Sequence, residues 1–120
     1  MINHRPNRIG DPDLFALCRA IEVARHRVPQ VEMPSQLLSV FLYIASTDDI
    51  CTLVHIQQAL GIRQSSASRL TNWLADKTRT GKPGLNWITK EQWGQTVRVY
   101  LTPIGQSIAR EIWETAYGKT

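Results

Sequence analysis

The stretch from residue 64 to residue 72 is rich in hydrogen-bonding side chains and contains no acidic residue. They are Gln64, Ser65, Ser66, Ser68, Arg69 and Asn72. Arginine and glutamine can bond to base edges in DNA, and hydroxyl groups can bond to phosphates. Serine and asparagine have low helix propensity, so these residues are an unfavourable choice for a helix face that contacts only water. We therefore predict contact with nucleic acid, in preference to a merely solvated helix face.

The residues around this stretch predict a helix-turn-helix. Apolar residues at helical spacing mark one helix over about 53–60 and a second over about 64–76. Gly61 lies between them, where it can end the first helix with a positive φ. Ile62 adds an apolar side chain to the shared corner. Two short helices joined by a glycine turn are typical of this motif.

Positive charge is concentrated on this unit and on the residues after it. The 120-residue chain has a formal net charge of +4 and a pI of about 9.4. The segment 63–98 contains seven Lys or Arg and two Asp or Glu, a net charge of +5, which leaves −1 for the rest. Such an asymmetry is expected of a DNA-binding protein. The further basic residues expected on DNA are Arg63, Arg79, Lys82, Lys90 and Arg98.

The other reactive residues predict neither catalysis nor a metal site. We interpret Cys18 and Cys51 as buried free thiols rather than a redox pair, and the three histidines lack metal-ligand spacing. Paired carboxylates and a glycine-rich phosphate loop are both missing, so we predict a non-enzyme without cofactor. The N-terminus is polar, and no apolar run approaches the ~20 residues of a membrane span. A cytoplasmic protein is expected.

Further helices precede the helix-turn-helix. We predict a loose arm over residues 1–10 and one domain over residues 11–118. Aspartate, proline and aspartate at 11–13 indicate the start of a helix that runs to about residue 28. A second helix over about 34–46 is apolar nearly all round and is expected to be central and buried.

The residues after the helix-turn-helix predict a hairpin and a last helix. A basic loop over 77–84 leads to strands at Trp87–Lys90 and Val97–Leu101, with six residues between them. A short strand at Ile50–Cys51 is also indicated. Thr102 and Pro103 start the final helix, which Gly118 ends. The predicted fold class is mainly α with a small β-hairpin wing: a winged helix-turn-helix with about five helices.

Two runs resemble the multiple antibiotic resistance regulator (MarR) family of winged-helix proteins. Ala59–Leu70 (ALGIRQSSASRL) resembles its recognition segment, and Val97–Gly105 (VRVYLTPIG) resembles the end of its wing. The resemblance covers roughly residues 12–117. It implies a bacterial, archaeal or phage transcription regulator, such as a repressor, that binds a pseudo-palindromic site as a homodimer. Its small-molecule effector, if it has one, is not identified by any residue pattern.

The resemblance also implies roles for particular residues. Ser65, Ser66, Ser68 and Arg69 would face the major groove, and the wing, about 87–101, would approach the minor groove or backbone. Three departures stand against it. The family's Asp-x-Arg is absent from the wing tip, Gln92–Thr96. The loop over 77–86 looks longer and more basic than is usual in the family, and the chain stops after one C-terminal helix.

Apolar residues of the first and last helices are the predicted dimer surface. They are Leu14, Leu17, Ile21, Ile108, Ile112 and Trp113. The competing interpretation packs these residues onto the central helix and leaves a monomer, and for Trp113 we expect such internal packing. The alternative function is a protein-interaction module, such as a phage antirepressor or assembly adaptor, because tryptophan is enriched at interfaces.

Overall fold

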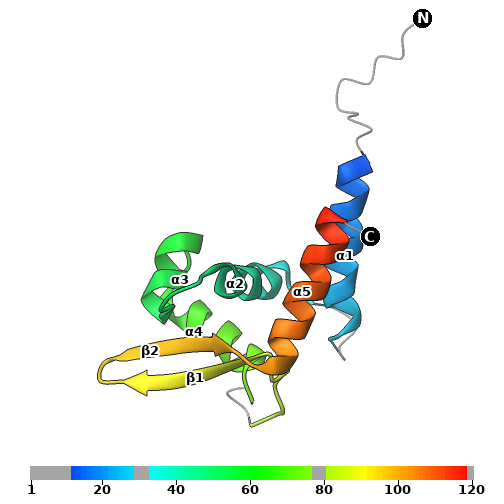
Figure 1. Ribbon diagram of the computed structural model, residues 1–120. Coiled ribbons are helices and arrows are strands. Elements are labelled where there is room, and N and C mark those ends of the chain that lie inside the picture. Colours follow the sequence, from blue (N-terminus) through cyan, green and yellow to red (C-terminus); the bar gives the residue numbers. More distant parts are fainter. Residues whose placement is uncertain (1–11, 29–32, 77–80, 119–120) are drawn as a thin grey trace, which may run out of the picture.

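A computed structural model describes residues 12–28, 33–76 and 81–118, with side chains from residue 15 onward (Figure 1). Its elements are α1 (Pro12–His26), α2 (Ser35–Ser46), α3 (Leu53–Leu60), α4 (Gln64–Leu74), β1 (Ile88–Trp93), β2 (Thr96–Leu101) and α5 (Pro103–Tyr117). The predicted arm over 1–10, the Asp11 cap and the Pro29 helix stop lie outside the described residues. The order of elements confirms the predicted winged-helix fold class.

Helices α1 and α5 lie side by side in opposite directions and rise from the rest of the molecule (Figure 1). Arg27, just after α1, forms an ion pair with Glu111 of α5. Gly118 has a φ of 42° and ends α5 as predicted. The lower body contains α2, α3, α4 and the hairpin. No helix in the described ranges is long and apolar enough to cross a membrane.

Helix α2 provides the centre of the core. Leu37, Val40 and Phe41 are completely buried. The Phe41 ring meets the Trp87 ring edge-on, with 4.9 Å between centroids. The expectation that α2 is buried nearly all round is wrong at Leu42, which is 38% exposed because this side of α2 borders an open groove beside α1 and α5.

The start of α5 is anchored to the segment that precedes the wing. The Thr102 hydroxyl accepts the N–H of Gly105 (3.0 Å) and donates to the carbonyl of Asn86 (2.7 Å). Pro103 occupies the first turn, where it loses no helical hydrogen bond. A Cβ at Gly105 would lie 2.0 Å from the Trp87 carbonyl oxygen. The glycine of the Leu-Thr-x-x-Gly run is therefore needed for close backbone approach.

The wing is longer than the sequence pattern predicts. β1 and β2 pair antiparallel from Ile88 opposite Leu101 to Trp93 opposite Thr96. The six-residue connection expected between the strands is wrong, because pairing continues until only Gly94 and Gln95 remain. Gly94 has a φ of 61°, as suits the first position of a two-residue turn. The missed extension consists of Glu91, Gln92 and Trp93 in β1 and Thr96 in β2, so its β-branched signal is weaker than that of the rest.

Two smaller expectations also change. Cys51 is a buried free thiol, but Cys18 is exposed, because it lies on a side of α1 that α5 leaves uncovered. The predicted strand at Ile50–Cys51 is reduced to a single bridge between Thr52 and Arg98. The Cys51 carbonyl still accepts the N–H of Val99 (2.9 Å), so this segment borders the wing.

Candidate nucleic-acid interface

The turn between α3 and α4 fixes how α4 is presented. At the start of α3, the Thr52 hydroxyl accepts the N–H of His55 and His55 Nδ1 accepts the N–H of Thr52, each at 3.2 Å. At its end, Gly61 has a φ of 66°, which glycine adopts at little cost. The N–H groups of Gly61 and Ile62 both donate to the carbonyl of Gln57. The chain therefore passes directly from α3 into α4.

One side of α4 is fixed in the core and the other side is free. Ala67, Leu70 and Leu74 are buried. Ser65 and Arg69, four residues apart, lie on the opposite side and are exposed. The hydrophobic contacts of α4 thus hold its polar side outward, as the sequence pattern predicts.

The predicted contact residues of α4 differ in exposure. Arg63, Gln64, Ser65 and Arg69 are exposed, whereas Ser66, Ser68 and Asn72 are half-buried. Arg63 is the N-cap residue of α4, and its side chain makes no capping hydrogen bond. Within the described residues, only Asn72 of this set uses its side chain in a hydrogen bond. The other donors and acceptors are available to a partner molecule.

Lys90 joins the wing to α4. It lies opposite Val99, and because Val99 is buried, both side chains are on the sheet face that meets the body. Lys90 Nζ donates to Asn72 Oδ1 at 2.7 Å. Burial lowers the pKa of the Lys90 ammonium. Two residues predicted to contact DNA independently are therefore bonded to each other, a pairing that sequence spacing does not reveal.

The outer face of the wing carries a second arrangement. The Arg98 guanidinium carbon lies 4.1 Å from the ring centroid of Trp93. The indole Nε1 of Trp93 donates to Glu91 Oε1 at 2.7 Å. These residues alternate along the two paired strands, so they share one sheet face. Sequence analysis missed this cluster because it placed Glu91 and Trp93 in a loop; Gly94 as a turn signal was the available clue.

The segment after α4 turns back onto the end of that helix. The N–H groups of Leu85 and Trp87 donate to the carbonyls of Trp73 and Leu74, at 2.9 and 2.8 Å. A Cβ at Gly84 would lie 2.2 Å from the Ala75 carbonyl oxygen. The hydrogen bonds from Leu85 and Trp87 occupy the last carbonyl groups of α4, so the helix ends at Leu74 rather than near residue 76.

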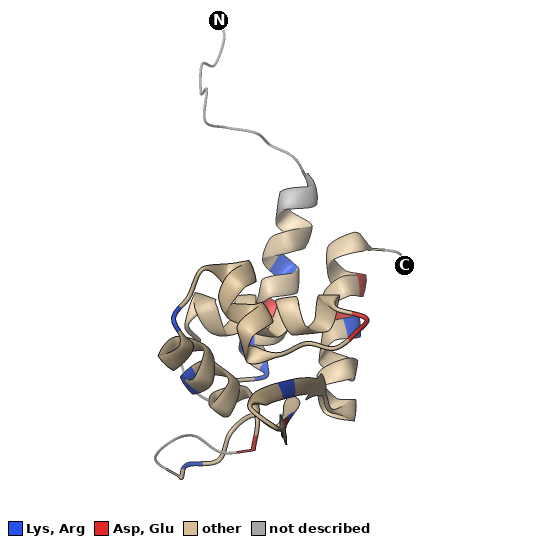
Figure 2. Ribbon diagram, turned by 90° about the vertical axis from the view of Figure 1, so that its left-hand side faces the viewer, with Lys and Arg blue, Asp and Glu red and all other residues tan. Residues whose placement is uncertain are grey.

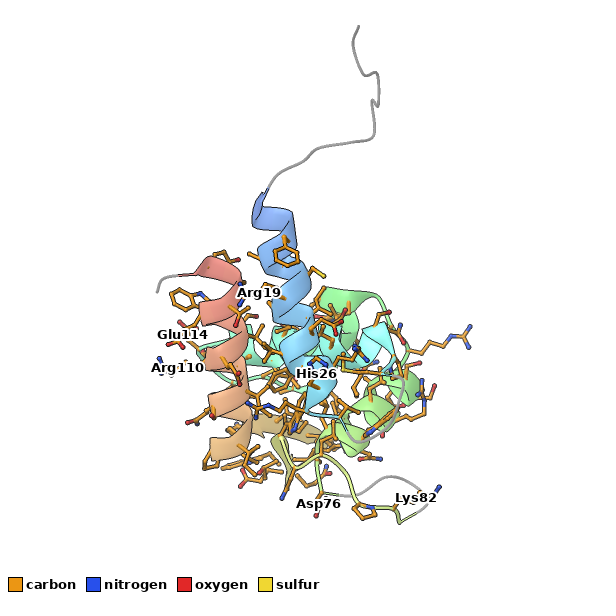
Figure 3. All side chains as sticks on the ribbon, turned by 90° about the vertical axis from the view of Figure 1, so that its right-hand side faces the viewer. Arg19, His26, Asp76, Lys82, Arg110 and Glu114 are labelled. Atoms are coloured by element: carbon orange, nitrogen blue, oxygen red, sulfur yellow. The ribbon has the colours of Figure 1, made fainter. Side chains whose placement is uncertain are left out.

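The basic residues around this segment extend the candidate surface. Several Lys and Arg positions fall on the hairpin and on the helices beside it (Figure 2). Lys82 is exposed and lies far from Arg19 of α1 (Figure 3). Arg79 lies outside the described residues. Positive charge therefore occurs on the hairpin and in the segment after α4 as well as on α4 itself.

The predicted dimer residues divide between core and surface. Ile108 and Ile112 are buried within the chain and belong to its core, and Ile112 also lines an open groove between α1, α2 and α5. The exposed members are Leu17, Ile21 and Trp113, at 46%, 47% and 58%. The internal packing expected for Trp113 is wrong. The side chain of Leu14 lies outside the described part of the chain.

The exposed members border an open apolar groove of about 640 Å³ between α1, α2 and α5. Leu42 and Tyr117 line it as well, and the rings of Trp113 and Tyr117 lie 5.7 Å apart. The groove is on the antiparallel pair of helices α1 and α5 (the α1–α5 arm), separate from the polar face of α4. Among the described residues, no cluster of three His, Cys, Asp or Glu side chains is suited to hold a metal ion.

Comparison with known proteins supports the fold. No protein-family model and no curated protein matches the chain. A solved structure of Bordetella bronchiseptica BpsR, concerned with the regulation of BpsR DNA binding by 6-hydroxynicotinic acid, aligns with a TM-score of 0.52 and 18% sequence identity. The alignment covers 98% of this chain and 85% of the BpsR chain. This chain is thus similar to BpsR in its winged-helix fold.

Proposed function

We propose that this protein binds double-stranded DNA with sequence specificity and regulates transcription. The observation that carries the proposal is the exposed face of α4, whose side chains Gln64, Ser65 and Arg69 have no partner among the described residues. This face lacks acids, and the hairpin wing lies beside it. With α4 in a major groove, the wing would lie on the backbone or the adjacent minor groove.

The contact residues have separate roles in this proposal. Arg69 and Gln64 would read base edges, and the serines of α4 would bond to phosphates or bases. Arg63, Arg79, Lys82 and Arg98 would contact phosphates. Lys90 and Asn72 would position the wing against α4, because their polar groups already bind each other.

The alternative, a protein-interaction module, has less support at this surface. Hot spots of protein interfaces are enriched in Trp, Tyr and Arg and lie in well-packed, desolvated pockets. The exposed side chains of α4 are Gln64, Ser65 and Arg69, so this face exposes one residue of these types and no aromatic ring. A group of exposed apolar residues, Leu17, Ile21 and Trp113, lies on the α1–α5 arm instead.

Selection of bound duplexes from a random pool tests the proposal. We expect an enriched sequence motif, and we expect Arg69→Ala to lose about 1–3 kcal/mol of binding free energy to it. Arg19→Ala is the matched control, because Arg19 is also exposed but lies on α1 (Figure 3). No enrichment, or equal affinity of the Arg69→Ala and Arg19→Ala variants, would contradict the proposal.

We also infer that two copies associate through the groove on the α1–α5 arm. Leu17, Ile21 and Trp113 expose large apolar side chains there, and contiguous apolar surface on a folded protein marks interaction sites. One recognition helix reads few base pairs, whereas two helices spaced by about 34–36 Å read two half-sites. A dimer thus supplies the specificity that a regulator needs.

Sedimentation equilibrium at micromolar concentration tests the dimer. We expect twice the monomer mass of 13.6 kDa for the wild type, and the monomer mass for Trp113→Glu. Ile104→Glu is the control, because Ile104 is just as exposed on α5 but does not line the groove. A 13.6 kDa wild type that binds one half-site would remove the dimer from the proposal.

A further inference from the structure

The tip of the wing presents one large aromatic side chain to solvent. Trp93 is the last residue of β1 and is 50% exposed. Only Gly94 and Gln95 separate it from β2, so it stands at the end of the projecting hairpin (Figure 1). Burying an indole is strongly favourable, so exposure at such a site needs an explanation.

Trp93 is held in one orientation rather than left loose. Its indole Nε1 donates to Glu91 Oε1 at 2.7 Å, and Arg98 covers its ring at 4.1 Å. Below it, the Thr96 hydroxyl donates to the Trp93 carbonyl at 2.8 Å and the Gln92 amide donates to the Gly94 carbonyl at 2.8 Å. A partner would therefore meet a side chain that loses little conformational entropy on binding.

The chemistry of the exposed part of Trp93 limits what it can contact. The N–H group is already bonded and Arg98 lies over the ring, so the exposed remainder is apolar. The guanidinium of Arg98 donates hydrogen bonds in its own plane, so stacking leaves these donors available. The side chain of Arg98 makes no hydrogen bond or ion pair to the described residues. The tip thus combines an apolar wedge with free cationic donors.

This combination fits duplex DNA better than a protein. The exposed neighbours of Trp93 at the tip are Gln92, Gly94, Gln95 and Thr96. They are small or polar, so Trp93 is the large apolar side chain exposed at the tip and is not part of a contiguous apolar patch of the kind that marks protein interaction sites. Proteins that kink DNA insert single apolar side chains between base steps from the minor groove. The Glu91 carboxylate opposes phosphate approach, but its Oε1 is turned to the indole.

We propose that Trp93 inserts at a base step of the bound duplex and unstacks it, with Arg98 stacked behind the indole and donating to the backbone. This inference rests on the proposed DNA-binding function. It assigns to the wing a readout of base-step deformability, in place of the hydrogen bonding of an Asp-x-Arg pair. Flexible pyrimidine–purine steps would be favoured at the position of the wing tip.

The test uses the selected duplex with 2-aminopurine placed singly at each step beneath the wing. Wild-type protein should raise the fluorescence at one step, and the bound duplex should migrate as bent DNA in a circular-permutation assay. Trp93→Ala should abolish both signals and weaken binding about tenfold, with an unchanged salt slope. Trp93→Phe should restore part of both signals. Far-ultraviolet circular dichroism checks that the variants fold.

The outcomes separate this proposal from the function on which it rests. Unchanged fluorescence and bending in Trp93→Ala would overturn the wedge while leaving DNA binding intact. So would wild-type binding without any fluorescence rise. Failure of the wild type to bind any duplex would overturn both proposals.

Discussion

Replacing Lys90 with methionine tests whether the wing is fixed to α4 by one hydrogen bond. The substitution keeps an unbranched apolar stem and removes the ammonium that donates to Asn72 Oδ1 at 2.7 Å. Hydrogen bonds to charged groups contribute about 1.5–3 kcal/mol to stability. Both residues are half-buried, and burial lowers the pKa of Lys90, so desolvation of the ammonium offsets part of this. We expect a coupling of about 1 kcal/mol between the two side chains.

A double-mutant cycle in urea measures this coupling. Wild type, Lys90→Met, Asn72→Ala and the double variant give four free energies of unfolding, from which the interaction of the pair follows. Lysine binds its proton less tightly in the folded chain, so the folded state is penalised at neutral pH and gains stability as pH rises towards 10.5. The free energy of unfolding of the wild type should therefore increase relative to that of Lys90→Met as pH rises in this range.

The same variants separate positioning from phosphate contact. If Lys90 only positions the wing, Lys90→Met weakens DNA binding but leaves the salt slope unchanged. A phosphate contact would instead reduce the slope by about one unit. A coupling indistinguishable from zero in urea, together with a salt slope reduced by about one unit, would refute the claim that Lys90 positions the wing against α4.

Four further expectations concern stability and the thiols. Gly105→Ala should lower the free energy of unfolding by about 1–3 kcal/mol in urea, because its Cβ would meet the Trp87 carbonyl at 2.0 Å; an unchanged midpoint would contradict the close approach. Thr52→Ala should cost about 1 kcal/mol by loss of the α3 cap, measured in the same way, and equal stability would mean that the cap is dispensable. Burial raises the pKa of the Cys51 thiol, so the folded state holds this proton more tightly than the unfolded state does. The resulting contribution to the free energy of unfolding is complete below about pH 9 and is lost as pH rises further. Cys51→Ala should lack this alkaline loss when unfolding is measured as a function of pH. A thiol reagent should label exposed Cys18 before Cys51, and equal rates would disagree with the structure.

The sequence predicts those elements whose local signals agree with their packing. Gly61 and Thr102 each carry a turn or cap chemistry that has few alternatives, and the structure places both as expected. The apolar pattern of α4 likewise predicts which side of that helix is buried. These signals act within a few residues of each other, so one sequence is enough to reveal them.

The errors arise where distant segments decide the outcome. Ile108 and Trp113 belong to the same apolar pattern, yet only Ile108 is buried in the core, whereas Trp113 is exposed. Lys90 resembles any other basic residue of the wing until β1 is placed beside α4. The partnership of Trp93 and Arg98 depends on a strand register that turns at Gly94. Helical periodicity does not reveal which neighbouring helix an apolar face packs against. Composition does not reveal which Lys or Arg side chain is already hydrogen-bonded within the protein.

The salt dependence of binding to the selected duplex tests the central claim most directly. Four basic residues assigned to phosphates, Arg63, Arg79, Lys82 and Arg98, predict that the logarithm of the binding constant falls linearly with the logarithm of salt concentration. The expected slope is about −3 to −4 per chain, since each phosphate contact contributes roughly −0.9. Fluorescence anisotropy between about 50 and 200 mM salt covers the informative range. A slope near zero, or equal affinity for selected and scrambled duplexes, would contradict sequence-specific DNA binding by α4 and the wing.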